Sequence, residues 1–456
     1  MAISKSKIIA ISVFIISFVV FYAGFRYNTW QVLKNGKFLD NQAESLVVGR
    51  LVKSAADGIT SSGGLCGRCY NQKNDTALFE NQYRAFLNNE SCKKYVPYLS
   101  QIGFHAMVYF AIDKASPFKK STDLQIMYAF KSGMLAMVMS FIVLWFLLEL
   151  GLLPAIFVSA GILLTPWFTF LGRDLWFCIW TNFLPFLAAL FILRQENRTG
   201  KPNGRSILLI VSLVVLFSFI YNGFEWVTTT LIMTAVPFFY YWRMGQWPFA
   251  RLAKRIGWLV AGSLASVMIT FSILIYQIAQ VKGTISKGIE WLIFSFQKRT
   301  YGGGEDLPEV FEKQIDHSIW EVFLINLGGV AFPFPAFISQ HVPRYFGGIL
   351  FAEILFILII ITCLILYRRN YLKIKEENRK WLQNLSIVTW ISLLAPFSWF
   401  VIFKGHAWSH HHINYITWWM PFGLFVMALL GSFFKVWVAN RFIGSEAVSK
   451  ALRATS

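Results

Sequence analysis

Charged residues are scarce in this sequence. Of its 456 residues only 14% are Asp, Glu, Lys or Arg, while 56% are hydrophobic and 18% are aromatic. Soluble proteins have about a quarter charged residues, so the composition excludes an ordinary soluble domain. A lipid bilayer is the solvent that suits such a chain. We therefore predict an all-α polytopic membrane protein that forms a single domain over residues 1–456.

Carboxylates are the scarcer kind of charge. The chain has 23 Asp and Glu against 42 Lys and Arg, which gives a formal net charge of +19. In a soluble protein such an excess would indicate a nucleic-acid partner. In a membrane protein, basic residues concentrate in cytoplasmic loops instead. We therefore expect the lipid bilayer, and no nucleic acid, among the partners.

Ionisable side chains are almost missing from the long apolar runs. Lys131 and Glu149 lie toward the edges of one run, and Glu353 lies near the end of another. Pumps and ion-coupled transporters place carboxylates or histidines deep within their spans. The scarcity of such residues argues against that class and favours chemistry or binding at the membrane surface.

Ten apolar runs are long enough to be membrane spans, each of which needs roughly 20 residues. They cover about residues 8–25, 124–148, 152–170, 175–193, 206–222, 226–242, 257–278, 347–367, 383–403 and 416–436. The first run follows Lys5 and Lys7, as in a signal peptide. No convincing small-residue cleavage site follows it, so we expect a retained span.

Basic residues set the expected orientation. Outside the two long segments, most basic residues lie in the short loops and the tail on one side of the predicted spans. These residues are Arg194, Arg198, Lys201, Arg205, Arg243, Arg251, Lys254, Arg255, Arg368, Arg369, Lys373, Lys375, Arg379, Lys380, Lys435, Arg441, Lys450 and Arg453. The short loops on the other side have only Arg173 and Lys404. The positive-inside rule then places both termini in the cytoplasm and the long segments 26–123 and 279–346 outside it.

The chain has only five cysteines, and three of them fall in the first long segment. Cys66 and Cys69 form a CxxC, but they lack the context of a soluble redox domain. We expect one structural disulfide that joins Cys92 to either Cys66 or Cys69, as in an oxidising compartment.

The start of the first long segment predicts a short amphipathic helix over residues 44–56. Val47 and Leu51 are four residues apart on one face, and we expect this helix to lie flat at the lipid boundary. Glu44 would sit in its first turn. One interpretation of Glu44 is a catalytic carboxylate, and the other is a helix-end carboxylate stabilised by the helix dipole. Asp57 follows the helix and opens a glycine-rich loop.

Histidine is rare, yet four of the seven histidines lie in one stretch, KGHAWSHHHINY at residues 404–415. Imidazole titrates near neutral pH and provides hydrogen bonds without a fixed charge. A second polar motif is Lys298-Arg299, which precedes Gly302-Gly303-Gly304 and predicts either a phosphate-binding turn or an ordinary solvated one.

Together these pieces resemble the GT-C superfamily of integral membrane glycosyltransferases, in particular bacterial members linked to surface polysaccharides. The resemblance rests on motifs scattered along nearly the whole chain: Glu44-Ser45 with Asp57-Gly58 and Gly63-Gly64-Leu65, residues 98–103, 172–176, 180–185, Gly223-Phe224-Glu225, residues 298–302, and Lys404-Gly405-His406 with His410, His412, Asn414, Trp418 and Pro421. Many members have two adjacent acidic residues in the first loop, whereas here Ala43 precedes Glu44.

The resemblance implies transfer of a sugar from a polyprenyl-phosphate donor to a cell-envelope glycan or glycolipid, with inversion, on the extracytoplasmic face of a bacterial inner membrane. The catalytic candidates are Glu44 as the base, with Asp57 and Asp174 as further carboxylates. The substrate-binding candidates are Arg173, Glu225, Lys298, Arg299, Lys404, His406, His410 and His412. The sugar and the acceptor stay open.

Three alternatives remain at this stage. His406 and His410, with a carboxylate such as Glu44, Asp174 or Glu225, would suit zinc or manganese. Asp174 and Glu225 would also suit purely structural roles at the ends of spans. The whole chain would also suit a flippase, polymerase or exporter of lipid-linked glycans, although such a protein needs a polar path through its spans.

Overall fold

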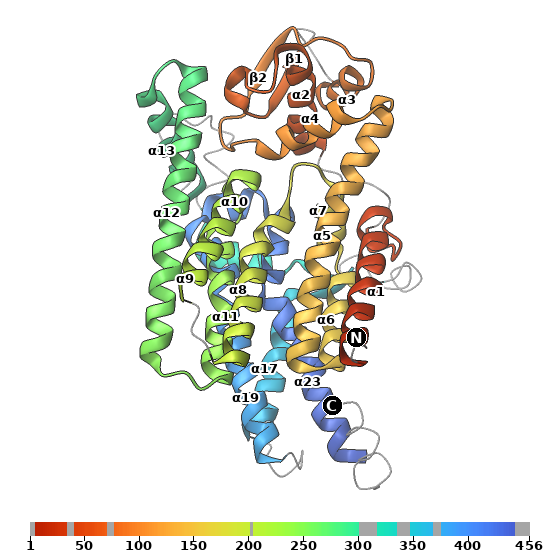
Figure 1. Cartoon of the computed structure of the whole chain (residues 1–456), viewed down its shortest axis with the longest axis vertical. Helices are drawn as coiled ribbons and strands as arrows, with labels where there is room; N and C mark the ends of the chain where they lie inside the picture. Colours follow the sequence, from red (N-terminus) through yellow and green to blue (C-terminus); the bar gives the residue numbers. More distant parts are fainter. Residues whose placement is uncertain are drawn as a thin grey trace.

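The computed structural model describes residues 5–33, 41–70, 77–200, 204–300, 317–334, 347–367 and 375–442. This part of the chain is mostly helical, as the sequence predicts. Figure 1 shows a long bundle of helices with a smaller cap at one end. Helix α1 begins, and α23 ends, toward the end of the bundle that is remote from the cap.

The cap follows α1 in sequence and mixes helices with two short strands. Its elements are α2 (Asn41–Asp57), the 3-10 turn η1 (Ser61–Gly64), β1 (Gly67–Tyr70), α3 (Leu78–Leu87), β2 (Lys94–Pro97) and α4 (Phe104–Ala115). Strands β1 and β2 pair antiparallel, with Cys69 opposite Tyr95. The two strands are a finding that the sequence does not predict.

The bundle is made mainly of long helices, with a few short ones between them. They are α1 (Lys5–Tyr27), α5 (Lys120–Leu150), α6 (Leu152–Leu164), α7 (Pro166–Arg173), α8 (Ile179–Thr199), α9 (Gly204–Ser206), the π-helix η2 (Ile207–Val211), α10 (Ser212–Asn222), α11 (Val227–Met244), α12 (Phe249–Lys282), α17 (Phe351–Tyr367), α19 (Glu376–Ser392), α20 (Leu394–Ile402) and α23 (Phe422–Phe442).

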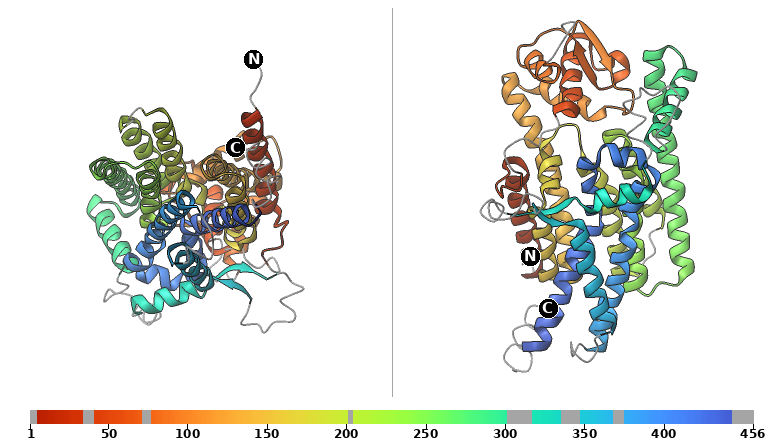
Figure 2. Two further views of the ribbon diagram at one scale, coloured as in Figure 1. Left: turned by 90° about the horizontal axis from the view of Figure 1, so that it is seen from below. Right: turned by 180° about the vertical axis from the view of Figure 1, so that it is seen from behind.

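Several shorter elements surround one end of the bundle. They are α13 (Ile285–Thr300), α15 (Ile319–Leu327), β3 (Val330–Pro333), β4 (Gly348–Leu350), α21 (Lys404–Ser409), α22 (His411–Asn414) and η3 (Tyr415–Trp419). Strands β3 and β4 pair antiparallel and stand out from the side of the bundle in both views of Figure 2. Helix α13 returns alongside the end of α12 that lies nearest the cap (Figure 1).

Within the described residues, five helices are long and apolar enough to cross a membrane. They cover Lys7–Tyr27, Lys120–Leu150, Phe249–Lys282, Glu376–Ile402 and Phe422–Ala439. Helices α6 and α7 make a sixth candidate if the pair, bent by 59°, counts as one span. The bend falls at Pro166, which has no N–H to continue the ladder of α6. The chain is therefore a helical protein with several helices suited to a bilayer.

All ten predicted runs coincide with one helix or a pair of consecutive helices. Two of the shorter ones, Ile207–Asn222 and Phe351–Tyr367, are apolar but shorter than a usual span. Helices α8 and α11 have polar side chains that contact other parts of the bundle, such as Asn182 and Thr230. Buried polar contacts of this kind dilute the apolar signal of a span without removing the helix.

Helix α2 forms where the sequence predicts a helix, but its surroundings differ. Val47, Val48 and Leu51 are fully buried, and the helix packs against α3, β1 and α4 within the cap. The prediction that α2 lies flat on a lipid surface is therefore wrong. Its apolar face is covered by the rest of the cap, because the segments after it fold back over that face.

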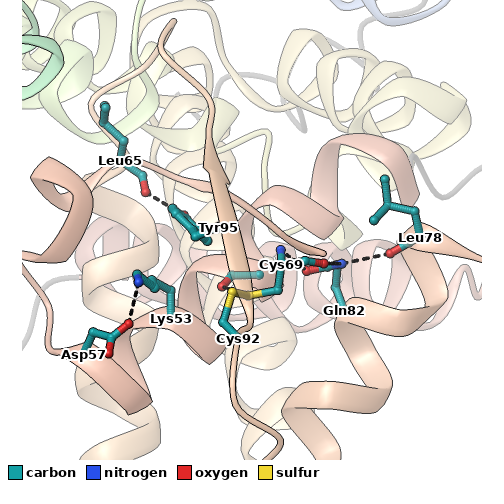
Figure 3. The surroundings of a disulfide bond; sticks show 9 residues. Lys53, Asp57, Leu65, Cys69, Leu78, Gln82, Cys92 and Tyr95 are labelled. Carbon is teal, nitrogen blue, oxygen red and sulfur yellow. Dashed lines mark hydrogen bonds and ion pairs between the residues drawn. A yellow bond between two sulfur atoms is a disulfide. The ribbon is translucent and has the colours of Figure 1, made fainter. Parts of the chain in front are cut away.

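One disulfide bond cross-links the cap. Cys69 on β1 is bonded to Cys92, and Cys66 is a buried free thiol. Figure 3 shows the Gln82 side chain beside this bond, where its amide pairs with both the backbone N–H and the backbone carbonyl of Cys69, each at 2.8 Å. The predicted single disulfide is confirmed, and its partner in the CxxC is Cys69.

Candidate functional site

Three short connections meet at the end of the bundle next to the cap. They follow α7, α10 and α20, and asparagines hold them together. Asn222 accepts from the Cys178 backbone N–H at 2.7 Å and donates to Asn182 at 2.8 Å. Asn182 in turn donates to the backbone carbonyl of Glu225 at 3.2 Å. All of these groups are buried, so the network fixes the first two connections relative to each other.

Asn414 attaches the third connection. Its Oδ1 accepts hydrogen bonds from the indole N–H groups of Trp226 at 2.9 Å and Trp399 at 3.0 Å. Its Nδ2 donates to the backbone carbonyl of His406 at 3.3 Å. Asn414 is fully buried. The amide thus links the turn that contains Glu225 to the helix that contains His406.

A cavity of about 230 Å³ opens beside this junction. The cap contributes Tyr98 and Ser100, α13 contributes five residues and the histidine stretch contributes four. The lining residues of the two last groups are Trp291, Phe294, Ser295, Lys298, Arg299, Gly405, His406, Ser409 and His410. Four of these side chains, those of Lys298, Arg299, His406 and His410, are candidates that the sequence predicts.

Glu225 lies directly behind the lining of this cavity, against Arg299 and His406. Its Oε1 lies 3.7 Å from Arg299 Nη2 and accepts from Gln101 Nε2 at 3.4 Å. Its Oε2 lies 3.6 Å from His406 Nε2. Glu225 is only 4% exposed. The sequence-predicted residues Glu225, Arg299 and His406, which span about 180 positions of the chain, are therefore brought into one cluster.

The imidazole of His406 is neutral at pH 7. Burial lowers its pKa well below the usual value, and the neighbouring His410 and the cations of α13 lower it further. The rings of His406 and His410 are 4.6 Å apart. Burial and the adjacent Arg299 also lower the pKa of Lys298. The cavity therefore combines two basic side chains with the imidazoles of His406 and His410, and the lowered pKa of His406 favours its neutral form.

The two basic residues of α13 lie on a helix and not in a glycine turn. Lys298 and Arg299 occupy its last turn, which ends at Thr300. Cations are favourable there because the C-terminal end of a helix is electronegative. Neither predicted interpretation of this motif, a phosphate-binding turn or a solvated turn, describes these two residues. Gly302, Gly303 and Gly304 lie outside the described residues.

Glu44 lies in a different cluster. Its Oε1 accepts from the hydroxyl of Tyr83 at 2.6 Å and from that of Tyr128, and its Oε2 accepts from the Leu175 backbone N–H at 2.8 Å. Glu44 is 2% exposed. Burial raises the pKa of this carboxyl, and the three hydrogen bonds oppose the rise. The side chain joins α2 to α3, to α5 and to the connection after α7.

The connection after α7 lies between Glu44 and the cavity. Leu175 binds Glu44, and the neighbouring Trp176 packs against Tyr98 with ring centroids 5.4 Å apart. Tyr98 lines the cavity. Glu44 itself is not among the lining residues, and Leu175 and Trp176 connect it to the cavity through Tyr98.

Asp174 shapes this connection. It is fully buried, and its Oδ1 accepts from the backbone N–H groups of Trp176 at 2.7 Å and Phe177 at 3.3 Å. This is an Asx-type turn, in which an aspartate side chain replaces a backbone partner. Arg173, at the end of α7, is partly buried. Neither residue lines the cavity.

The remaining candidates lie farther out. Asp57 ends α2 and pairs with Lys53, with its side chain 46% exposed. It is separated from Glu44 by 13 helical residues, about 20 Å along the axis. Lys404 begins α21 and is partly buried, and His412 is exposed with its ring 6.1 Å from that of His410. These three residues are outside the lining of the cavity.

The metal interpretation finds no ligand set in the part of the chain that the structure describes. No three side chains of His, Cys, Asp or Glu come close enough there to hold one ion. His406 and Glu225 are adjacent, but Glu44 Oε2 and Asp174 Oδ1 accept instead from the backbone N–H groups of Leu175 and Trp176.

Sequence reasoning missed several aromatic residues of both clusters. Tyr83 binds Glu44, and Trp291 and Phe294 line the cavity. Single aromatic residues in the two long segments between apolar runs have no periodicity that distinguishes them. In α13, however, Phe294 lies four residues before Lys298, and this helical spacing places them on one face.

Comparison of the chain with protein-family models, with curated proteins and with solved structures finds no match in any of the three.

Proposed function

We propose that this chain is an integral membrane glycosyltransferase of the GT-C type, with ten spans, which moves a sugar from a polyprenyl-phosphate donor to a cell-envelope glycan or glycolipid. The observation that supports it best is the basic cavity at the junction of α13, the histidine stretch and the cap. Two cations and two imidazoles in the lining, with the Glu225 carboxylate directly behind them, suit a sugar attached to a phosphate.

The chemistry has two needs. The phosphate leaves the sugar with the electron pair of the broken C–O bond, and positive groups must stabilise it. Lys298 and Arg299 have that role in the proposal, helped by hydrogen bonds from His406 and His410. The acceptor hydroxyl must lose its proton as it attacks the anomeric carbon, and a carboxylate takes that proton.

Glu44 remains our prediction for the base. Its raised pKa brings the carboxyl nearer to neutral pH, where a general base works best. Both of its oxygens accept hydrogen bonds in the structure. The role therefore requires Tyr83, Tyr128 or Leu175 to release one oxygen when the acceptor binds. Asp174 then serves by shaping the Leu175–Trp176 connection.

The membrane arrangement in the proposal follows the basic loops. The ten predicted runs cross a bacterial inner membrane, both termini lie in the cytoplasm, and the cap and the cavity face outward. The common position of the cap, α13 and the histidine stretch at one end of the bundle supports this arrangement (Figure 1).

The test is glycosyl transfer by the purified protein from a panel of polyprenyl-phosphate sugars. We expect the double variant Lys298→Met/Arg299→Met to lower transfer by about 100-fold or more, because removing one group that stabilises a developing oxyanion typically costs 10²–10³ in rate. The matched control is Lys287→Met, an exposed cation on the same helix. Transfer from no donor, with a lipid-linked glycan still bound, would instead support a flippase, polymerase or exporter.

A further inference from the structure

Two neighbouring buried side chains beside the cavity each have one polar atom that the protein does not satisfy. In the described part of the chain, Glu225 Oε2 and His406 Nδ1 make no hydrogen bond. Glu225 Oε2 and His406 Nε2 are 3.6 Å apart, longer than a good hydrogen bond. Glu225 is 4% exposed and His406 is 8% exposed. Buried groups of this kind are rare without a partner, so a ligand that supplies one is the natural complement.

The backbone is held in an unusual shape to place Glu225 there. Gly223 has φ 72° and Trp226 has φ 56°, so the residues on both sides of Phe224-Glu225 are left-handed. Trp226 is fully buried and its indole is tied to Asn414. A bulky residue with positive φ costs free energy and persists only where its surroundings enforce it, commonly at functional sites.

The chemistry of the pair selects its ligand. Glu225 offers acceptor oxygens, and a neutral imidazole offers one donor and one acceptor. A phosphate oxygen beside Glu225 would be repelled by the carboxylate. A metal ion lacks a third ligand among the described side chains. A hydroxyl fits both groups, because it donates to the carboxylate and accepts from the imidazole N–H.

We propose that Glu225 and His406 hold a hydroxyl of the sugar whose phosphate lies against Lys298 and Arg299. This inference rests on the proposed function and adds a sugar subsite to it. The cavity lining agrees with a sugar ring: Trp291 and Phe294 provide apolar faces, and Ser295 and Ser409 provide hydroxyls.

The subsite lets the protein distinguish loaded from spent lipid. A sugar-bearing lipid satisfies both the cations and Glu225. A bare polyprenyl phosphate has no hydroxyl at that place and leaves Glu225 unpaired beside an added negative charge. The cavity should therefore bind the donor and release the product, although both have the same phosphate and the same polyprenyl chain.

The experiment compares the binding of two probes to the full-length protein in detergent. The probes are a short polyprenyl phosphate and the same lipid with one hexose on its phosphate, taken from the donor series that supports transfer. The variant is Glu225→Gln. Its control is Glu290→Gln, which removes an exposed carboxylate from α13 outside the cavity lining.

We expect the wild type to bind the hexosyl lipid more tightly than the bare phosphate. Glu225→Gln should weaken the binding of the hexosyl lipid by about 10- to 100-fold, which is the affinity that a hydrogen bond to a charged group contributes. The bare phosphate should bind Glu225→Gln as well as it binds the wild type or more tightly, because a negative charge has left the cavity. Glu290→Gln should behave as the wild type.

Equal weakening of both probes would overturn the subsite and assign Glu225 a structural role. No change for either probe would also overturn it. Wild-type protein that binds neither probe would refute the proposed function as well. If Glu225→Gln fails to fold, Glu225→Asp keeps the charge but shortens the side chain. It should weaken binding of the hexosyl lipid and leave binding of the bare phosphate unchanged.

Discussion

The two buried carboxylates Glu44 and Glu225 differ in the hydrogen bonds that the protein makes to their oxygens. Glu44 is bonded on both oxygens by two tyrosines and a backbone N–H. Glu225 has one oxygen near Arg299, and its other oxygen makes no hydrogen bond within the described part of the chain. At the scale of single residues, the protein therefore satisfies both oxygens of Glu44 but only one oxygen of Glu225.

The first prediction separates the two roles of Glu44. Glu44→Gln should lower transfer by about 100-fold or more if the carboxylate is the base. Tyr83→Phe removes one hydrogen bond to that carboxylate, and a hydrogen bond to a charged group contributes about 1.5–3 kcal/mol to stability. This variant should therefore have lower thermal stability but keep its transfer activity. Turnover and the unfolding midpoint in detergent measure both effects.

Glu80→Gln, on the exposed side of α3, is the control and should match the wild type. Full transfer by a folded Glu44→Gln protein would remove Glu44 as the base and return that role to Asp57 or Asp174, the other predicted carboxylates.

The second prediction concerns pH and His105. This side chain is fully buried, its Nδ1 lies 2.9 Å from the carbonyl oxygen of Tyr221, and burial lowers its pKa to about 4. The folded state therefore binds fewer protons than the unfolded state between about pH 6.5 and pH 4. Stability should fall as the pH falls through that window, by about 1.4 kcal/mol for each pH unit.

His105→Asn keeps a donor near Tyr221 but does not titrate, so its unfolding midpoint should depend less on pH than that of the wild type. His406 contributes with the same sign, because its pKa is also lowered, and a residual slope is expected. The partly exposed His411, replaced by Asn, is the control. An unchanged pH profile for His105→Asn would contradict the prediction.

At the scale of elements, the sequence predicts helices better than strands. The apolar spacing of Val47 and Leu51 predicts α2, because one face must be buried whatever covers it. Strands β1 and β2 have four residues each, which is too short for an alternating pattern. They exist because Gln82 and the disulfide hold Cys69 in an extended conformation.

Several residues of the candidate site could be singled out from the sequence, but their contacts with one another could not. The sequence places Glu225, Arg299 and His406 between predicted spans. Their mutual contact depends on where α13 returns against α21, and on the asparagines that fix the turns. No local pattern contains that information. The same limit explains why Glu44 and Asp57 share one helix yet belong to different surroundings.

The third prediction concerns the cap as a unit. The Cys69–Cys92 bond closes a loop with a sequence separation of 23 residues. Closing a loop of that size stabilises a fold by about 3 kcal/mol through the unfolded chain. Cys69→Ser/Cys92→Ser should lower the unfolding midpoint of the cap, measured by proteolysis between residues 41 and 115. Cys66→Ser is the comparison, since that thiol is free. Equal protease resistance in the double variant and the wild type would contradict this prediction.

At the scale of the whole molecule, the ends of the bundle differ in their polar chemistry. The cap and α13 lie at one end (Figure 1). Residues of the cap, of α13 and of the histidine stretch line the cavity. The basic residues predicted to be cytoplasmic include several that are paired within the bundle: Arg194 with Glu149 at 2.6 Å, and Arg255 with Glu196 at 2.7 Å. Pairing lowers the cost of placing these charges near an apolar phase.

The last prediction tests the orientation that all the functional proposals require. In a background where the exposed free Cys363 is replaced by Ser, one new cysteine is introduced either at Asn88 in the cap or at Glu377 near the start of α19. Both positions are exposed, and they lie toward opposite ends of the molecule (Figure 1). An impermeant maleimide added to intact spheroplasts should label Asn88→Cys at once. It should label Glu377→Cys only after lysis, because the basic loop before α19 is retained in the cytoplasm.

The reverse pattern would place the cavity inside the cell. Labelling of both positions from outside would show that the number of spans between them is even, where the proposed topology requires seven, and the ten-span arrangement would then be wrong.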